Sequence, residues 1–119
     1  MVRGMPEVER IKKAYELLEA VGLRNKVNRK PTEISGGEQQ RVAVARALVN
    51  DPTIILGDEP TGNLDSKTGA EVVNLMKKIN SDLGTTFILV THNPEVANAT
   101  SRIVHLRDGQ IAREEIIPS

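Results

Sequence analysis

The sequence contains no cysteine and no tryptophan, and it has only one Tyr and one Phe. Without cysteine, a disulfide scaffold and a cysteine nucleophile are both excluded, and a reducing compartment is compatible with the composition. The scarcity of aromatic residues leaves the core to Val, Ile, Leu and Ala, which suits helices packed on a parallel sheet. It also removes the aromatic platforms on which single-stranded nucleic acid usually stacks.

The chain has no excess of one charge and no long apolar run. Its 16 acidic residues balance 16 Lys and Arg residues, so a nucleic-acid face built on bulk positive charge is not expected. The longest apolar stretches, Thr53–Leu56 and Phe87–Val90, have the length of strands, whereas a membrane helix needs about 20 residues. The polar start is not expected to be a signal peptide. Any membrane role therefore requires a partner, and 119 residues suffice for one domain at most.

The glycine-rich motifs that hold nucleotide phosphates are missing as well. A phosphate-binding loop has the pattern Gly-x-x-x-x-Gly-Lys-[Ser/Thr], in which backbone N–H groups and the lysine hold the phosphates. No glycine of this chain is followed by lysine. The segment Gly62–Thr68 departs from the pattern because its lysine comes one place early and Ser66 replaces the second glycine.

Hydrophobic periodicity predicts an amphipathic helix from Pro6 to about Gly22, where the glycine ends it. We expect its apolar face to pack against the domain, with contact to a partner as the alternative. That face consists of Val8, Ile11, Tyr15 and Leu18. The basic, Asn-rich segment Arg24–Pro31 is expected to be a solvated loop.

A second helix is predicted from Ser35 to about Asn50. Ser35 and Glu38 have the spacing of a capping box, in which each side chain accepts the other residue's backbone N–H. Gly36 and Gly37 in the first turn each cost about 1 kcal/mol relative to alanine, which suggests that another group approaches the backbone closely. Free amides and the helix dipole favour a phosphate there, although an ordinary capped loop has the same local pattern.

Adjacent carboxylates follow the next element. The β-branched run Thr53–Gly57 predicts a buried strand, and Asp58 and Glu59 come at its carboxyl end, where open α/β sheets bind their ligands. A capped loop after a strand would look the same.

Four further elements are predicted after these carboxylates. The first is a helix over Ser66–Leu83 that ends at Gly84, and its apolar face consists of Val72, Met76, Ile79 and Leu83. It is followed by a buried strand over Thr86–Thr91 and a short helix capped by Asn93. The last is a hairpin of Arg102–Arg107 and Gln110–Glu114.

Two histidines complete the candidates. His92 directly follows the second predicted strand, although a lone histidine is more often structural or exposed. His105 lies in the predicted hairpin, and metal binding by two scattered histidines is not expected.

The run from Ile34 to Leu48 resembles the signature of the ATP-binding cassette (ABC) family, Leu-Ser-Gly-Gly-Gln followed by Gln-Arg-x-Ala-x-Ala-Arg-Ala-Leu. There are two departures. Ile34 replaces leucine, and Glu38 replaces glutamine, which keeps the capping role and adds a negative charge. The resemblance implies that Ser35, Gly36, Gly37 and Glu38 contact ATP bound to an opposing subunit.

Three further motifs of this family follow in order. Asp58-Glu59 resembles the Walker B element, which implies that Asp58 holds Mg²⁺ through water and that Glu59 orients and deprotonates the attacking water. Thr61–Asp65 resembles the D-loop, which places Asp65 at the dimer interface. His92 matches the switch histidine that contacts the γ-phosphate.

The resemblance covers about Arg3 to Glu115 and implies an α/β fold, a partial P-loop NTPase with a mostly parallel sheet flanked by helices. Residues 1–50 correspond to part of the helical subdomain and the signature helix. Residues 51–119 carry the Walker B, D-loop and switch-histidine core and end in the hairpin. In the family an amino-terminal part brings the Walker A phosphate loop. We therefore expect this chain to be the carboxyl-terminal half of an ABC ATPase, from a truncated gene, a late start or a designed fragment.

The implied function is ATP hydrolysis in an ABC transporter, with the chain inactive alone for want of Walker A. The implied cofactors are ATP and Mg²⁺. The implied partners are a second ATPase subunit, a transmembrane permease subunit and the missing Walker A half, without nucleic acid. The implied location is cytoplasmic, at the inner face of the membrane. The run Asp58–Gly69 looks most like the branch that serves lipoprotein release, macrolide export and antimicrobial-peptide export.

Two other readings remain open. One is a non-catalytic fragment that binds a complete ABC subunit, which would need a self-sufficient core. The other is a segment of a DNA-repair or chromosome-organising ATPase, which shares the signature and Walker B chemistry. The helix over Gln39–Leu48 and the absence of coiled-coil heptads favour the transporter.

Overall fold

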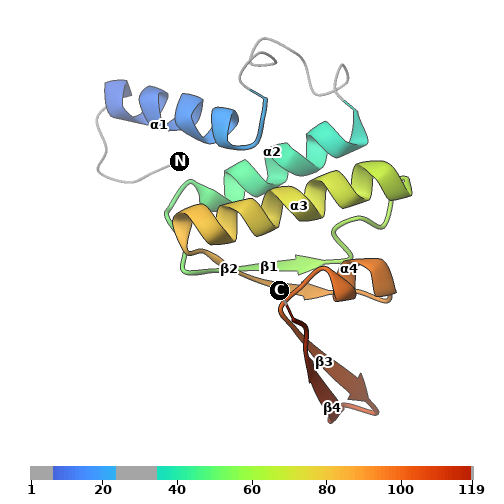
Figure 1. Cartoon of the computed structure of the whole chain (residues 1–119). Helices are drawn as coiled ribbons and strands as arrows, with labels where there is room; N and C mark the ends of the chain where they lie inside the picture. Colours follow the sequence, from blue (N-terminus) through green and yellow to red (C-terminus); the bar gives the residue numbers. More distant parts are fainter. Residues whose placement is uncertain (1–6, 24–34, 119) are drawn as a thin grey trace.

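The computed structural model describes residues 7–23 and 35–118, and its elements follow the predicted order (Figure 1). Pro6, the connector Arg24–Pro31 and Ile34 lie outside the described residues. In chain order the elements are α1 (Glu7–Ala20), α2 (Gly36–Leu48), β1 (Ile54–Asp58), α3 (Ser66–Leu83), β2 (Thr86–Val90), α4 (Pro94–Asn98), β3 (Arg102–Arg107) and β4 (Gln110–Ile116).

Helices cover one side of a two-stranded parallel sheet. β1 pairs with β2 so that Ile54 lies opposite Thr86 and Asp58 lies opposite Val90. Two parallel strands need a long connection, and α3 supplies it. In Figure 1, α2 and α3 run side by side above the sheet, with α1 beyond α2. The predicted α/β class is confirmed, with one parallel pair and one antiparallel pair among the described residues.

The core lies where α2 and α3 meet the segment that follows α1. Ile55, Phe87 and Leu89, on the helix-facing side of the sheet, pack against it. Its buried residues are Val21, Leu23, Val44, Ala45, Leu48, Val72, Met76 and Ile79. The predicted inner face of α3 is thus confirmed except at Leu83, which is 59% exposed because it ends the helix just before Gly84.

The expectation that both strands are buried is wrong for one face of the sheet. Successive side chains of a strand point to opposite sides, and only one side meets the helices. On the other side, Leu56 is 76% exposed, and Ile54, Ile88 and Val90 are exposed with it. We call this side, on which these four side chains are exposed, the outer sheet face.

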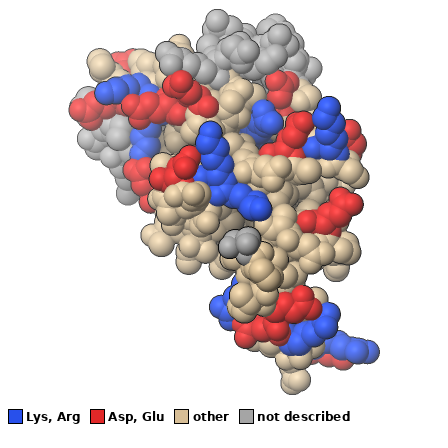
Figure 2. All heavy atoms as spheres, in the orientation of Figure 1, with Lys and Arg blue, Asp and Glu red and all other residues tan. Residues whose placement is uncertain are grey.

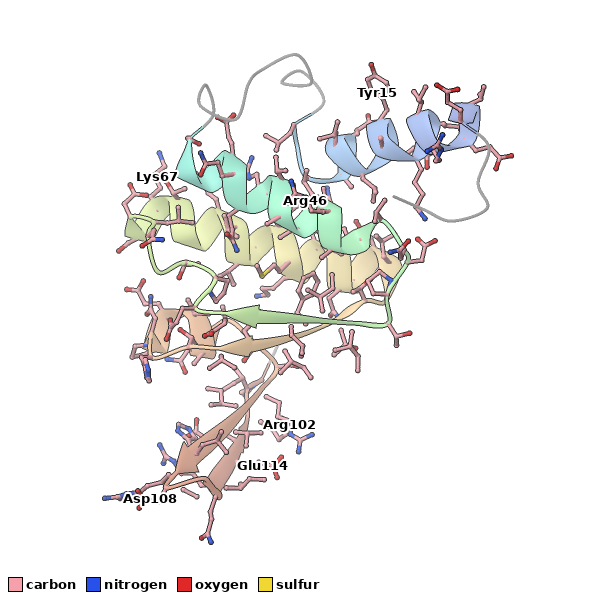
Figure 3. The ribbon with its side chains drawn as sticks, turned by 180° about the vertical axis from the view of Figure 1, so that it is seen from behind. Tyr15, Arg46, Lys67, Arg102, Asp108 and Glu114 are labelled. Atoms are coloured by element: carbon pink, nitrogen blue, oxygen red, sulfur yellow. The ribbon has the colours of Figure 1, made fainter. Side chains whose placement is uncertain are left out.

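The expected packing of the apolar stripe of α1 is confirmed at Leu18 and wrong at its other three residues. Val8 is 79% exposed, and Ile11 and Tyr15 are exposed as well. Figure 3 shows Tyr15 pointing away from α2. Only the last turn of α1, with Leu17 and Leu18, reaches the core, because α1 continues into the buried residues Val21 and Leu23. The structure therefore leaves the alternative, contact with a partner, open for this stripe.

The hairpin of β3 and β4 extends away from the helices and the parallel sheet (Figure 1). Asp108 and Gly109 form its turn with φ of 51° and 75°, as in the two-residue turns that suit the twist of a hairpin. Arg102 and Glu114 form an ion pair across the strands, and Figure 3 shows the two side chains together. The predicted hairpin is confirmed, and its second strand continues to Ile116.

Charges of both signs are interspersed over the face drawn in Figure 2, without a large area of one sign. This distribution agrees with the balanced composition. In the described part of the chain, no helix has the length and apolarity needed to cross a membrane.

Candidate functional site

The amino end of α2 is a capping box, as predicted. Ser35 Oγ accepts a hydrogen bond from the Glu38 backbone N–H at 3.1 Å, and Glu38 Oε1 accepts one from the Ser35 N–H at 3.0 Å. The carboxylate of Glu38 is therefore turned back onto the cap. In such a cap the amides of the first two helical residues, here Gly36 and Gly37, have no partner within the helix.

A close approach to the glycine backbone was also predicted, and a neighbouring helix makes it. Gly37 is buried, and a Cβ atom placed on it would lie 2.4 Å from Thr68 Cγ2 of α3. A Cβ on Gly36 would lie 3.2 Å from Leu64 Cδ2. Close packing of α2 on α3 and the segment before it therefore explains the glycines, and contact with a phosphate stays a prediction.

Asp58 and Glu59 stand at the carboxyl end of β1, as predicted. Asp58 is the last residue of the strand, and the Glu59 N–H continues the sheet by donating to the Val90 carbonyl at 2.7 Å. Glu59 has φ of 45°, a left-handed conformation that is uncommon outside glycine. Strained backbone of this kind clusters at functional sites.

The carboxylate of Glu59 is held by the segment that follows β2. The His92 backbone N–H donates to Glu59 Oε1 at 2.8 Å, and the Thr91 hydroxyl donates to Oε2 at 3.2 Å. The His92 imidazole is fully exposed, with Nε2 3.9 Å from Oε1. The structure therefore brings together Glu59 and His92, two of the predicted site residues, from the ends of two parallel strands.

Sequence reasoning missed Thr91. A hydroxyl residue directly after a parallel strand lies at the edge where such sheets bind ligands, which was the one signal in the sequence. Only the register, in which Asp58 lies opposite Val90, shows that Thr91 lies beside Glu59.

Asp65 forms the start of α3. Its carboxylate accepts a hydrogen bond from the Thr68 backbone N–H at 3.0 Å, which makes it the N-cap. Hydrogen bonds from Thr68, from its side chain first and its backbone second, lower the pKa of Asp65 below its ordinary value. This capping role does not depend on a second subunit, and a place at a dimer interface stays a prediction.

These residues lie at one end of the molecule. In Figure 1, the amino ends of α2 and α3 and the carboxyl ends of β1 and β2 all lie on the right. Figure 3 marks the same end from behind with Lys67, in the first turn of α3. A shallow groove beside it runs between α3 and α4, with Asp65, Asn74 and Asn93 on its walls. Neither Glu59 nor His92 lines this groove.

The described residues offer only part of a metal site. They contain no group of three or more acidic or histidine side chains that could hold an ion. Mg²⁺ is commonly held by one or two carboxylates, waters and substrate phosphates, so a single carboxylate at the end of β1 fits that ion. Asp58 is the residue in that place.

Comparison with known proteins gives one consistent result. A family model described as "ABC transporter" matches residues 4–62. The lipoprotein-releasing system ATP-binding protein LolD 1 of Rhodopseudomonas palustris is 54% identical over 110 residues, which cover 92% of this chain and 49% of that protein. The macrolide export ATP-binding/permease protein MacB of Nitrosomonas europaea is 48% identical over 113 residues, which cover 95% of this chain and 17% of that protein.

A solved structure agrees with the sequence relatives. It is the dimeric, post-hydrolysis state of the ATP-binding cassette MJ0796 bound to ADP and Pi, from Methanocaldococcus jannaschii. The TM-score is 0.78 at 48% identity, and the match covers 99% of this chain and 52% of that one. The chain thus spans about half the length of LolD 1 and of MJ0796. These matches, together with the capped signature helix and the paired carboxylates, show that the chain belongs to the ATP-binding cassette family of ABC transporters.

Proposed function

We propose that this chain provides the signature and hydrolytic elements of an ABC transporter ATPase and acts together with a segment that carries the Walker A phosphate loop. The observation that carries the proposal is the arrangement of Glu59 and His92 at the ends of two parallel strands. The same end of the molecule holds the capped amino terminus of the signature helix. No Walker A pattern occurs in the sequence, so the chain alone is expected not to bind or hydrolyse ATP.

The hydrolytic role falls to the carboxylates. Asp58 is placed to hold Mg²⁺, which when bound neutralises charge on the phosphates. Glu59 orients the attacking water and takes its proton. A carboxylate has about four acceptor sites, and two protein donors leave room for water on Glu59, whose side chain is 38% exposed. His92, with its exposed imidazole, contacts the γ-phosphate.

The signature helix serves a second nucleotide site. Ser35, Gly36, Gly37 and Glu38 meet ATP held by an opposing subunit, with the helix amides and dipole directed at the phosphate. Asp65 lies at the interface between the subunits. The dimeric state of the cassette MJ0796 supports this arrangement.

A permease is the third partner. MacB is named as a combined ATP-binding and permease protein, which supports coupling of this chain to a transmembrane subunit. The ATPase then lies in the cytoplasm, at the inner face of the membrane. The Walker A segment is proposed to cover the outer sheet face, where Leu56 and its neighbours are exposed.

The decisive experiment joins this chain to the amino-terminal half of a close relative and compares two substitutions. In Glu59→Gln the size and the Asp58 partner are kept while the base is lost, so ATP-bound dimers accumulate and phosphate release falls by about 10² to 10⁴. Ser35→Arg places a long cation at the dimer face, so ATP still binds and the dimer does not form. Gel filtration with ATP and a phosphate-release assay report both effects.

The outcomes are separable. Normal turnover of Glu59→Gln would show that Glu59 is not the base. An ATP-stable dimer of Ser35→Arg would show that the signature segment does not lie at the dimer interface. Saturable micromolar binding of Mg²⁺–ATP by the unjoined chain, measured by calorimetry, would contradict its dependence on a Walker A partner.

A further inference from the structure

The hydroxyl of Thr91 has two hydrogen-bond partners that fix its direction. Its Oγ1 accepts the backbone N–H of Asn93 at 2.9 Å and lies 3.2 Å from Glu59 Oε2. A hydroxyl has a single proton to donate. Since the amide of Asn93 can only donate, that proton is left for the carboxylate. Thr91 therefore presents a fixed donor to Glu59.

This donor and the His92 N–H together hold both oxygens of Glu59. The His92 N–H bonds Oε1 at 2.8 Å, while Thr91 bonds Oε2. One donor on each oxygen defines the plane of the carboxylate, which a single donor would leave free to rotate about the last side-chain torsion. The His92 imidazole cannot replace either donor, because its Nε2 lies 3.9 Å from Oε1, beyond hydrogen-bond distance.

The backbone contacts of Glu59 do not fix the orientation of its carboxylate. The positive φ of Glu59 is the strained part of the site, and the Glu59 N–H fastens the main chain to Val90 at 2.7 Å. These contacts fix the position of the Glu59 Cα atom but not the rotation of its carboxylate. The side chain that contacts the carboxylate and can fix this rotation is that of Thr91, one residue after Val90.

We propose that Thr91 is a positioning residue for Glu59, with its hydroxyl holding the carboxylate in the orientation that acts on water. This inference rests on the proposed function, because it assumes that Glu59 is the base. The rival role for Thr91 is purely structural, the fastening of the end of β2 to the start of α4 through the Asn93 N–H.

The test uses this chain joined to the amino-terminal half of a close relative. Thr91→Val keeps the shape and removes the hydroxyl, and Thr91→Ser keeps the hydroxyl and serves as the matched control. A misplacement of about 1 Å in a catalytic group can lower turnover by about 100-fold. We expect kcat of Thr91→Val to fall about 10- to 100-fold with KM for ATP nearly unchanged, and Thr91→Ser to stay within about threefold of the parent.

A double variant separates positioning from structure. In a Glu59→Gln background the group to be positioned is already lost, so Thr91→Val should lower the residual turnover no further. A purely structural role would instead multiply the two losses, because the contact with the Asn93 N–H does not depend on Glu59, and that result overturns the proposal. Thr91→Ala replaces Thr91→Val in every comparison if the valine variant does not fold.

The proposal and the function beneath it fail differently. If Glu59→Gln abolishes turnover while Thr91→Val turns over normally, only the role of Thr91 is refuted. If Glu59→Gln itself turns over normally, the assignment of the base is wrong, and the positioning role is overturned with it.

Discussion

Single residues at the candidate site have packing roles in addition to the chemical roles proposed for them. Gly37 belongs to the signature, and in this structure it is also the point at which α2 rests on Thr68 of α3. Glu59 carries the proposed chemistry and also accepts the bonds that join the ends of the two strands. A loss of activity after substitution at either position therefore has two sources, which only paired substitutions can separate.

For Gly37 the paired substitution is available. Gly37→Ala puts a Cβ 2.4 Å from Thr68 Cγ2, so the Thr68 side chain or one of the helices must shift, and overpacking of this kind costs roughly 1–3 kcal/mol. We expect Gly37→Ala, in the joined protein without nucleotide, to lower the free energy of unfolding by about that amount. Denaturant titration measures it.

The control for Gly37→Ala is the removal of its neighbour. Thr68→Ala deletes the methyl group that the new Cβ would meet. In the Thr68→Ala background, Gly37→Ala should therefore lower the free energy of unfolding much less than it does in the parent. Strictly additive losses would show that the contact with Thr68 is not the reason for the glycine.

Contacts within a few residues of sequence were predictable, and contacts between elements were not. The capping box of Ser35 and Glu38 and the Asn93 cap depend on atoms three residues apart or fewer, and both are confirmed. The bond from Thr91 to Glu59 joins residues 32 apart. It depends on the strand register, which no local pattern in the sequence gives.

Among the elements, the type and bounds of each were predicted better than the side on which it packs. The helix over Ser66–Leu83 is observed with the predicted bounds, since Gly84 takes the left-handed conformation that ends it. Periodicity also predicted the apolar stripe of α1 and the strand-like run of β1. It could not say that part of each would be exposed in the described structure, because burial depends on what lies opposite.

The start of α3 supplies a prediction at this scale. Because the pKa of Asp65 is lowered in the folded state, its contribution to stability is complete above the ordinary value of 3.8. That contribution is lost as the pH falls below 3.8 and through the lowered folded value. Asp65→Asn keeps a capping side chain without the charge. We therefore expect the stability difference between Asp65 and Asp65→Asn to shrink as the pH falls through this window.

Carboxyl carbon NMR shifts of Asp65 check the same prediction directly. Thr68→Val removes the hydroxyl that lowers the pKa of Asp65 most, so the midpoint of Asp65 should move back toward 3.8 in that variant. An unchanged midpoint would remove the Thr68 hydroxyl as the cause.

At the scale of the whole molecule, the two sides of the parallel sheet differ. One side packs on a continuous core under α2 and α3, and the other exposes Ile54, Leu56, Ile88 and Val90. Parallel sheets are normally covered on both faces, and two strands leave unpaired edges. We therefore expect the chain alone to be marginally stable and prone to association, and the partner segment to contribute a large share of the stability of the assembled domain.

The outer sheet face provides the last prediction. Burying a leucine side chain stabilises by about 1.5–3 kcal/mol, so Leu56→Thr should weaken association of this chain with a separately produced amino-terminal half by roughly 10- to 100-fold. In the chain alone the same substitution should change stability little and reduce aggregation, because Leu56 is 76% exposed there. The matched control is Leu83→Thr, since Leu83 is also exposed, at 59%, and lies at the end of α3 away from this face. Titration calorimetry of the two halves compares the variants. Equal weakening by both, or by neither, would mean that the partner segment does not cover the outer sheet face.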